Sequence, residues 1–265
     1  HIWVTNGLND TVSKLRASDG ELIGTYPVRD NAGYLVFDGT HIWVSGTDRV
    51  SKLRASDGEL ISTYPFAGYL LFDGTHIWVS GGDTVSKLRA SDGELIGTYP
   101  VGHDPAGQRM GDRVIWMGFD GTHVLSQALG LERNSVWKLR ASDGMLVDTY
   151  PGEGYPQFFD GTHIWSSDVS DDTVSRLRAS DGVLVDTYTV HRPSSVVSDG
   201  THFWVTVIGY EDNEMYKIRV SDGVVVGTYT VGNSGISHAR EFDGTHIWVI
   251  NKNDGTVSKI HASNF

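Results

Sequence analysis

Phe72-Asp73-Gly74-Thr75-His76-Ile77-Trp78-Val79 is a segment whose copies recur along most of this 265-residue chain. The histidine of its DGTH motif returns at regular positions, and His1 opens the chain in the same slot. The positions are His41, His76, His123, His163, His202 and His246. Successive gaps from His1 are 40, 35, 47, 40, 39 and 44 residues. A period near 40 residues indicates a repeat architecture.

Each repeat predicts four short strands separated by turns. In one repeat the expected strands cover residues 69–72, 76–79, 84–89 and 94–101. Asp-Gly pairs supply the positive φ that tight hairpins need, and β-branched and aromatic residues fill the segments between them. No helical period runs far enough to predict a crossover helix. Four antiparallel strands in every repeat predict an all-β fold, a β-propeller, because a solenoid of parallel strands needs no hairpin inside each repeat.

The number of blades follows from a count of strand slots. The second and third slots each occur seven times, whereas the first and fourth occur six times, which gives 26 strands. Seven four-stranded blades are the main expectation, with a segment upstream of His1 supplying the missing fourth and first strands. Six blades and a stray half-repeat are the alternative. We expect a single propeller domain over residues 1–265, with repeats starting near 1, 41, 76, 123, 163, 202 and 246.

Composition excludes several classes of partner. The formal net charge of −12 argues against nucleic acid and against anionic membranes. No apolar run approaches the roughly 18 residues of a transmembrane helix. Cysteine is absent while Gly and Trp are abundant, a composition that suits a secreted or cell-surface bacterial protein. The expected location is therefore extracytoplasmic, and the oligomeric state is left open.

Most positive charge belongs to the repeated framework. Thirteen of the 21 Lys and Arg residues lie in the K-L-R slot of the third strand. Aspartates of the DGT and SDG turns recur as often, so we expect a repeated lattice of ion pairs near the outer strands. The DGTH histidines are interpreted as framework residues for the same reason, since they occupy one structural slot.

Variation between repeats marks the candidate working face. The DGT and SDG turns share one face of the predicted propeller and are nearly invariant. The loops after the second and fourth strands share the other face, and they differ in length and chemistry. Loops that vary on a constant scaffold are typical sites of function.

Three tyrosines on the variable face are the predicted ligand-binding residues. Tyr34, Tyr69 and Tyr155 each follow a glycine at the start of a first strand. A tyrosine there could stack on a sugar or clamp a peptide, because its ring is apolar and its tip polar. Packing between blades is the alternative interpretation. Three arginines in loops of the same face complete the predicted set, and they are Arg109, Arg192 and Arg240.

A second set of residues on this face suggests catalysis or metal binding. His191, His238, Glu153 and Glu241 could perform acid–base chemistry or hold a divalent ion, Mg²⁺ or Ca²⁺, if they converge. His103 is a further histidine of these loops. Solvated loop residues are the alternative.

Another acidic loop, with Asp168, Asp171 and Asp172, lacks the Asp-x-Asp-x-Asp-Gly register of a calcium loop. No cofactor or metal is assigned.

The repeated segments resemble a known group of propellers. D-G-T-H-I-W-V followed by T-V-S-K-L-R-A-S-D-G-E-L-I-G-T-Y-P is similar to the YVTN family of bacterial and archaeal surface proteins, and more loosely to NHL and streptogramin lyase-like propellers. The resemblance implies an extracytoplasmic bladed ring that binds other macromolecules. Streptogramin lyases use His, Glu and magnesium to open a cyclic ester by elimination. Their W-F-T-E motif is replaced here by Trp43-Val44-Ser45 and Trp248-Val249-Ile250, so their catalytic residues are not carried over.

The near-identity of the repeats indicates recent amplification of one blade, or an engineered chain. We therefore expect a non-enzymatic binding or adhesion scaffold that presents its variable loops to a protein or a carbohydrate. The alternative is a streptogramin lyase-like C–O lyase, or a hydrolase, that uses the His and Glu residues named above with a divalent ion.

Overall fold

A computed structural model describes the chain except residues 30, 102–110, 131–134, 209–213, 233–236 and 264–265. For residues 111–113, 128–130, 237, 239 and 240 only the backbone is described. The described residues form 26 β-strands and one short 3-10 turn, Gly7–Asn9. The prediction of an all-β fold is confirmed. None of the described segments is a helix long and apolar enough to cross a membrane.

The chain divides into two compact units, residues His1–Thr149 and Tyr150–Phe265. The strands that begin in the first unit are β1 (Ile2–Asn6), β2 (Thr11–Leu15), β3 (Leu22–Pro27), β4 (Leu35–Phe37), β5 (His41–Ser45), β6 (Val50–Arg54), β7 (Leu60–Tyr64), β8 (Leu70–Phe72), β9 (His76–Gly81), β10 (Thr84–Arg89), β11 (Leu95–Pro100), β12 (Gly111–Phe119), β13 (His123–Gly130), β14 (Ser135–Arg140) and β15 (Leu146–Pro151). Those of the second are β16 (Tyr155–Phe159), β17 (His163–Asp168), β18 (Thr173–Arg178), β19 (Leu184–Thr189), β20 (Pro193–Ser198), β21 (His202–Val207), β22 (Glu214–Arg219), β23 (Val225–Thr230), β24 (Ser237–Phe242), β25 (His246–Asn251) and β26 (Thr256–His261).

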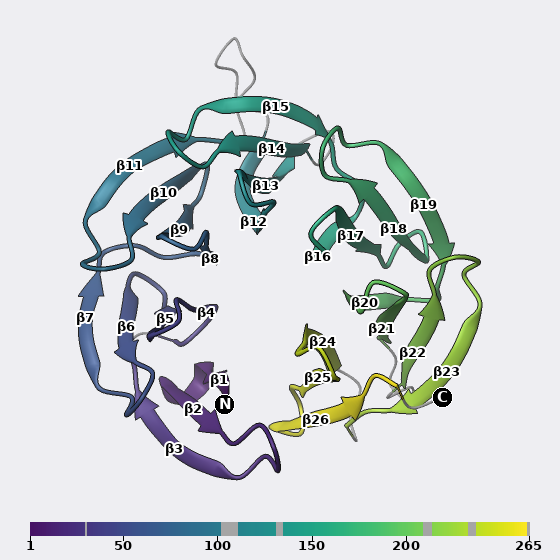
Figure 1. Ribbon diagram of the computed structural model, residues 1–265, viewed down its shortest axis with the longest axis horizontal. Coiled ribbons are helices and arrows are strands. Elements are labelled where there is room, and N and C mark those ends of the chain that lie inside the picture. Colours follow the sequence, from purple (N-terminus) through teal and green to yellow (C-terminus); the bar gives the residue numbers. More distant parts are fainter. Residues whose placement is uncertain (30, 102–110, 131–134, 209–213, 233–236, 264–265) are drawn as a thin grey trace. The chain divides into compact units, whose positions relative to one another are not determined.

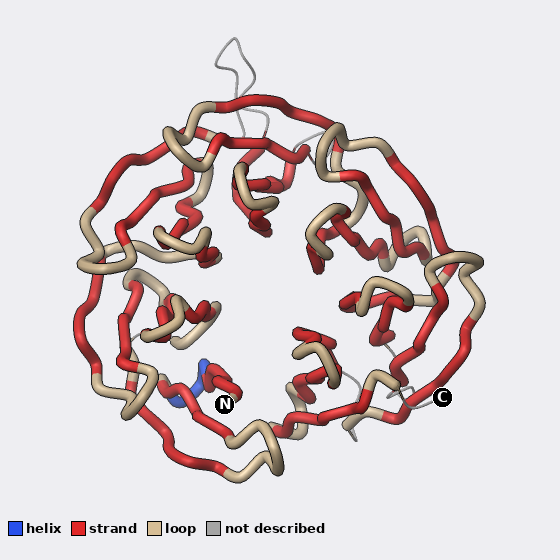
Figure 2. Tube along the Cα trace, viewed as in Figure 1, coloured by secondary structure: helices blue, strands red, loops and turns tan. Residues whose placement is uncertain are grey.

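Each repeat is one antiparallel sheet whose strands are hydrogen-bonded in sequence order (Figures 1 and 2). Five sheets have four strands, whereas β1-β2-β3 and β24-β25-β26 have three. The described strands therefore reproduce the predicted distribution, in which the second and third slots are each filled seven times and the first and fourth slots are each filled six times. We call each sheet a blade.

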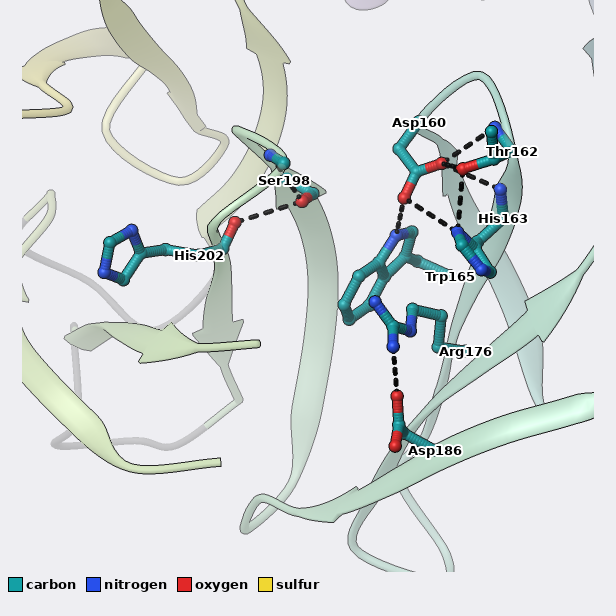
Figure 3. Close-up of polar contacts among 9 residues, drawn as sticks. Asp160, Thr162, His163, Trp165, Arg176, Asp186, Ser198 and His202 are labelled. Atoms are coloured by element: carbon teal, nitrogen blue, oxygen red, sulfur yellow. Dashed lines mark hydrogen bonds and ion pairs between the residues drawn. The ribbon is translucent and has the colours of Figure 1, made fainter. Parts of the chain in front are cut away.

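The DGTH turn is held by one aspartate that accepts several hydrogen bonds. Asp160 Oδ1 accepts the Thr162 amide at 2.9 Å, the Thr162 hydroxyl at 2.9 Å and the His163 amide at 2.7 Å. Its Oδ2 accepts the Trp165 indole N–H at 2.9 Å (Figure 3). Burial raises the pKa of Asp160, but these donors outweigh it, so the pKa lies below its usual value. The carboxylate thus ties the turn to the core.

The core lies between neighbouring blades of the same unit. Trp43 is fully buried and packs among Leu70, Ile77 and Val79 of the following blade. Equivalent tryptophans, such as Trp165, are also fully buried. Burial of such a side chain stabilises the fold by about 2–3 kcal/mol, so the repeated tryptophan fixes the stacking of one blade on the next.

The predicted charge lattice is found for the arginines beside the SDG turns, whereas a buried lysine such as Lys52 bonds backbone carbonyls instead. Arg54 Nη1 lies 2.9 Å from Asp57 Oδ2 of its SDG turn, and both side chains are exposed. Lys52 is only 2% exposed, and its ammonium donates to the carbonyls of Ala90 at 2.7 Å and Ser91 at 2.8 Å in the next blade. Burial lowers the pKa of Lys52. Lys52 lies in the middle of β6 opposite Trp43, whereas Arg54 ends the strand opposite His41, beside the SDG turn.

Candidate functional site

The nearly invariant face satisfies its polar groups internally. In six repeats the threonine hydroxyl or amide of the DGT turn bonds the turn aspartate, as Thr40 does with Asp38 at 2.8 and 2.9 Å. Arginines of the third strand are likewise held by SDG aspartates in six repeats, at Arg16, Arg54, Arg89, Arg140, Arg178 and Arg219. Groups already paired in this way have little to offer a ligand. The site is therefore sought on the opposite face.

The three predicted tyrosines are presented by a common backbone device. The Tyr34 and Tyr69 amides donate to the hydroxyls of Ser45 and Ser80, at 3.0 and 2.8 Å. Gly68, with φ of 139°, lies so close to Ser80 that a Cβ would be 2.0 Å from its carbonyl oxygen. Such an approach requires glycine. The glycine and serine thereby fix where each tyrosine leaves the sheet.

The third tyrosine also follows a glycine that lies close to a serine, in the second unit. A Cβ on Gly154 would lie 2.6 Å from the Ser167 carbonyl oxygen, and Tyr155 pairs with Ser167 in the β16–β17 register. Tyr155 is 51% exposed. Because this residue belongs to a different unit, it is described separately from the other two.

Tyr34 and Tyr69 form one aromatic surface. Their rings stack with centroids 3.8 Å apart and an interplanar angle of 26°. Tyr34 is 40% exposed, and the described residues offer no hydrogen-bond partner to its hydroxyl or to that of Tyr155. A stacked, half-exposed tyrosine pair is rigid and offers both an apolar face and a polar tip. This arrangement suits a sugar ring or a peptide side chain.

A polar cluster occupies the same face of the second unit, before β20. His191 Nδ1 lies 3.0 Å from Asp172 Oδ2, and the Arg192 amide donates to Asp172 Oδ1 at 2.8 Å. Asp172 and Arg192 both adopt positive φ, 54° and 48°. The Arg192 amide and His191 hold the pKa of Asp172 below its usual value. His191 is thus paired with an aspartate that the sequence interpretation assigned to a separate acidic loop.

His238 contacts a different residue. Its Nδ1 lies 3.3 Å from Ser194 Oγ, a hydroxyl that the sequence gave no reason to select. Glu241, three residues later on β24, pairs with Trp248 after a bulge in the register. Surrounding protein atoms and the charge of Asp243 raise the pKa of Glu241 even though part of its side chain reaches solvent. Glu153 is exposed, and among the described residues it forms no hydrogen bond or ion pair with either histidine.

The acidic loop is organised by local hydrogen bonds. Asp168 Oδ1 accepts the amides of Ser170 and Asp171, at 2.8 and 3.2 Å. Within the described ranges, no three His, Cys, Asp or Glu side chains are grouped so that they could hold a metal ion. Of the predicted arginines, Arg192 is exposed. Arg109 lies outside the described residues, as does His103, and the side chain of Arg240 is not described.

Comparison with known proteins supports the fold. No protein-family model matches the chain, and no curated protein matches it. The chain is similar in structure to hydrazine synthase from Kuenenia stuttgartiensis, with a TM-score of 0.75 and 12% identity over 98% of this chain and 92% of that one. It is also similar to the dihydro-heme d1 dehydrogenase NirN, with a TM-score of 0.67 and 15% identity over 98% of this chain and 73% of that one.

The fold is a seven-bladed β-propeller. At these identities the likeness concerns the fold alone, since a propeller supports many unrelated activities. The resemblance to the YVTN family rests on the repeated segments of the sequence.

Proposed function

We propose that this chain is a non-enzymatic, extracytoplasmic binding module that holds a carbohydrate or a protein on its variable loops. The observation that carries this proposal is the exposure of Tyr34 and Tyr155, 40% and 51%, with Tyr34 stacked on the partly buried Tyr69. Tyrosines that pack against the core tryptophans, such as Tyr64 and Tyr99, are less exposed. The opposite face, by contrast, pairs its charged groups with one another.

The chemistry of this surface favours a neutral or cationic ligand. Stacking on tyrosine suits the apolar face of a sugar ring, and each aromatic contact contributes about 0.5–1.5 kcal/mol. The net charge of −12 disfavours polyanions. A protein ligand would present aromatic or basic side chains to the same rings.

The test is the simultaneous change of Tyr34, Tyr69 and Tyr155 to Ala, assayed on a glycan array and on immobilised polysaccharides. We expect binding to fall at least about fivefold, because loss of the two stacked rings of the first unit alone costs about 1–3 kcal/mol. The matched control is Phe37→Ala, which removes an exposed aromatic ring at the end of β4 beside the DGT turn. Equal binding by the triple variant and the wild-type chain would contradict the site, provided that both have the same thermal melting curve.

Hydrolase or lyase activity is the second candidate, because Ser194 and His238 are in contact and the pKa of Glu241 is raised. A histidine beside a hydroxyl can accept its proton, and a carboxyl with a raised pKa can act as an acid. His238→Ala should then abolish turnover of cyclic or activated esters. Activity that survives this substitution would refute the assignment.

A further inference from the structure

The last repeat differs from the other six at one exposed position of the third strand. Where they carry Arg16, Arg54, Arg89, Arg140, Arg178 and Arg219, the last repeat carries His261. In the antiparallel register this residue lies directly opposite the DGTH histidine, as Arg219 lies opposite His202. In β25–β26 the pair is therefore His246 and His261. The last blade is the one whose described register puts two imidazoles opposite each other at this position.

The two rings are in edge-to-face contact. Their centroids are 4.9 Å apart and their planes meet at 75°. Directly opposite residues in an antiparallel pair hold their Cβ atoms about 4.5–5.5 Å apart, which is the spacing two side chains need to reach one ligand. In the other repeats a guanidinium occupies this position and would repel a cation. His261 removes that charge.

The Nδ1 atom of each imidazole ring already has a polar neighbour. His246 Nδ1 lies 3.5 Å from Asp243 Oδ1. The amides of Thr245 and His246 and the indole of Trp248 bond the Asp243 carboxylate at 2.7–2.9 Å. A carboxylate at Nδ1 favours a proton there and leaves Nε2 as the free electron pair.

His261 has a hydroxyl in the equivalent place. Ser263 Oγ lies 2.8 Å from His261 Nδ1, and the Ser263 amide lies 3.2 Å from the same atom. The amide favours an unprotonated Nδ1, whereas the hydroxyl can either donate to Nδ1 or accept a proton from it. Binding of a cation at Nε2 places the ring proton on Nδ1, where the Ser263 hydroxyl accepts it and the bond from the Ser263 amide is lost. Outer partners of this kind are typical of metal-binding histidines.

We propose that His246 and His261 form a two-imidazole site for a divalent transition-metal ion, with water completing the coordination. Imidazole nitrogen suits Zn²⁺, Ni²⁺ and Cu²⁺, whereas Mg²⁺ and Ca²⁺ prefer oxygen. The net charge of −12 raises the local concentration of cations. The site belongs to the β25–β26 hairpin alone and is independent of the tyrosine surface.

The test uses Zn²⁺ itself, titrated by calorimetry into the tag-free full chain in a non-chelating buffer. All variants carry His1→Ala, because an amino-terminal histidine can chelate a metal through its amine and ring. We expect one Zn²⁺ per chain, and we expect His261→Arg to weaken binding at least about 10–100-fold, since loss of even an outer partner costs that much. His261→Arg restores the residue of the other repeats, so the hairpin should stay folded.

A gain-of-function variant completes the design. Arg219→His, added to His261→Arg, puts an imidazole opposite His202 in β21–β22, and we expect it to restore the binding of one Zn²⁺. Ser263→Ala should weaken binding by about tenfold through the loss of the outer hydroxyl. Identical isotherms for the His1→Ala chain and its His261→Arg variant would overturn the proposal. If the Arg219→His variant is folded but binds no Zn²⁺, the assignment of the site to an opposed imidazole pair is overturned.

Discussion

At the scale of single residues, the turn aspartate contributes most to the repeat. Asp73 accepts two amides, a hydroxyl and the Trp78 indole, at 2.7–2.9 Å. Because four donors bond this nearly buried carboxylate, its pKa stays below its usual value despite burial. The blade with Leu125 in place of tryptophan provides a natural comparison. There Asp120 Oδ2 lies 3.0 Å from His123 Nδ1 and 3.8 Å from Lys138 Nζ instead.

Asp73→Asn should destabilise the protein. The amide can place its nitrogen against the Trp78 indole N–H, so two donors face each other and a charge-assisted bond is lost, at about 1.5–3 kcal/mol. For a chain of this size, we expect the Tm to fall by roughly 3–12 °C. Asp120→Asn is the matched control and should cost less, because the ring of His123 can accept from the new amide. Equal losses in Tm for the two variants would contradict the role of the indole bond.

At the scale of elements, β18 and β19 carry a charged pair where several other blades pair lysine with glycine. Where Lys14, Lys87 and Lys217 pair with glycine, Arg176 of β18 pairs with Asp186 of β19. Arg176 lies over the Trp165 ring, 5.5 Å from its centroid, and forms an ion pair with Asp186 (Figure 3). The larger cation is thus accompanied by a carboxylate within its own blade, whereas the lysines reach the carbonyls of the next blade.

Asp186→Gly alone should leave the partly buried guanidinium without its carboxylate. We expect a loss of about 1–3 kcal/mol, below the full cost of breaking a buried pair because the Asp186 side chain is 38% exposed. Adding Arg176→Lys to Asp186→Gly recreates the lysine–glycine pair of other blades and should recover most of the loss. Urea denaturation of the two single variants and the double variant measures the coupling. If the changes in the free energy of unfolding of the two single variants simply add up in the double variant, the two residues are not coupled.

The loop glycines set the orientation of the tyrosines. Gly68→Ala would push a Cβ against the Ser80 carbonyl at a φ of 139°, where a side chain costs about 1–3 kcal/mol. We expect both a lower Tm and weaker ligand binding, because Tyr69 and its stacked partner Tyr34 move together. Gly74→Ala is the control, since its φ is also positive but its Cβ would meet nothing within 4 Å. Unchanged ligand binding by Gly68→Ala would show that the backbone of this loop does not contribute to the binding site.

At the scale of the whole molecule, repetition explains what the sequence could predict. The strands, their slots and the framework role of the DGTH turns follow from residues that recur, so averaging over copies made them visible. The inward path of Lys52 was missed because strand alternation places it on the same face as Arg54, and the two differ only in how near they lie to the end of β6. The contacts of Ser194 with His238 and of Asp172 with His191 join residues 44 and 19 positions apart. No periodic signal predicts such contacts between loops.

Repetition also makes the response to acid steep. The pKa values of Asp38, Asp73, Asp120, Asp160 and Asp199 lie below the ordinary 3.8, and that of Asp243 is about 2. In each case burial acts upward and the hydrogen bonds overcome it. A lowered carboxyl pKa means that the unfolded chain takes up protons first. The stabilisation is therefore complete above about pH 4 and is lost as pH falls toward 2.

The burial of His76 adds a smaller loss of stability, which begins at a higher pH. Desolvation and nearby Lys87 lower its pKa below 6.5, so the unfolded chain binds this proton first as well, and stability begins to fall below about pH 6.5. We expect the Tm of the wild-type chain to decline gently from pH 7 to 4 and steeply from pH 4 to 2. The Asp73→Asn variant, which starts from a lower Tm, should show a shallower acid limb because one linked proton is gone. Parallel limbs in the two chains would show that Asp73 does not contribute to acid unfolding.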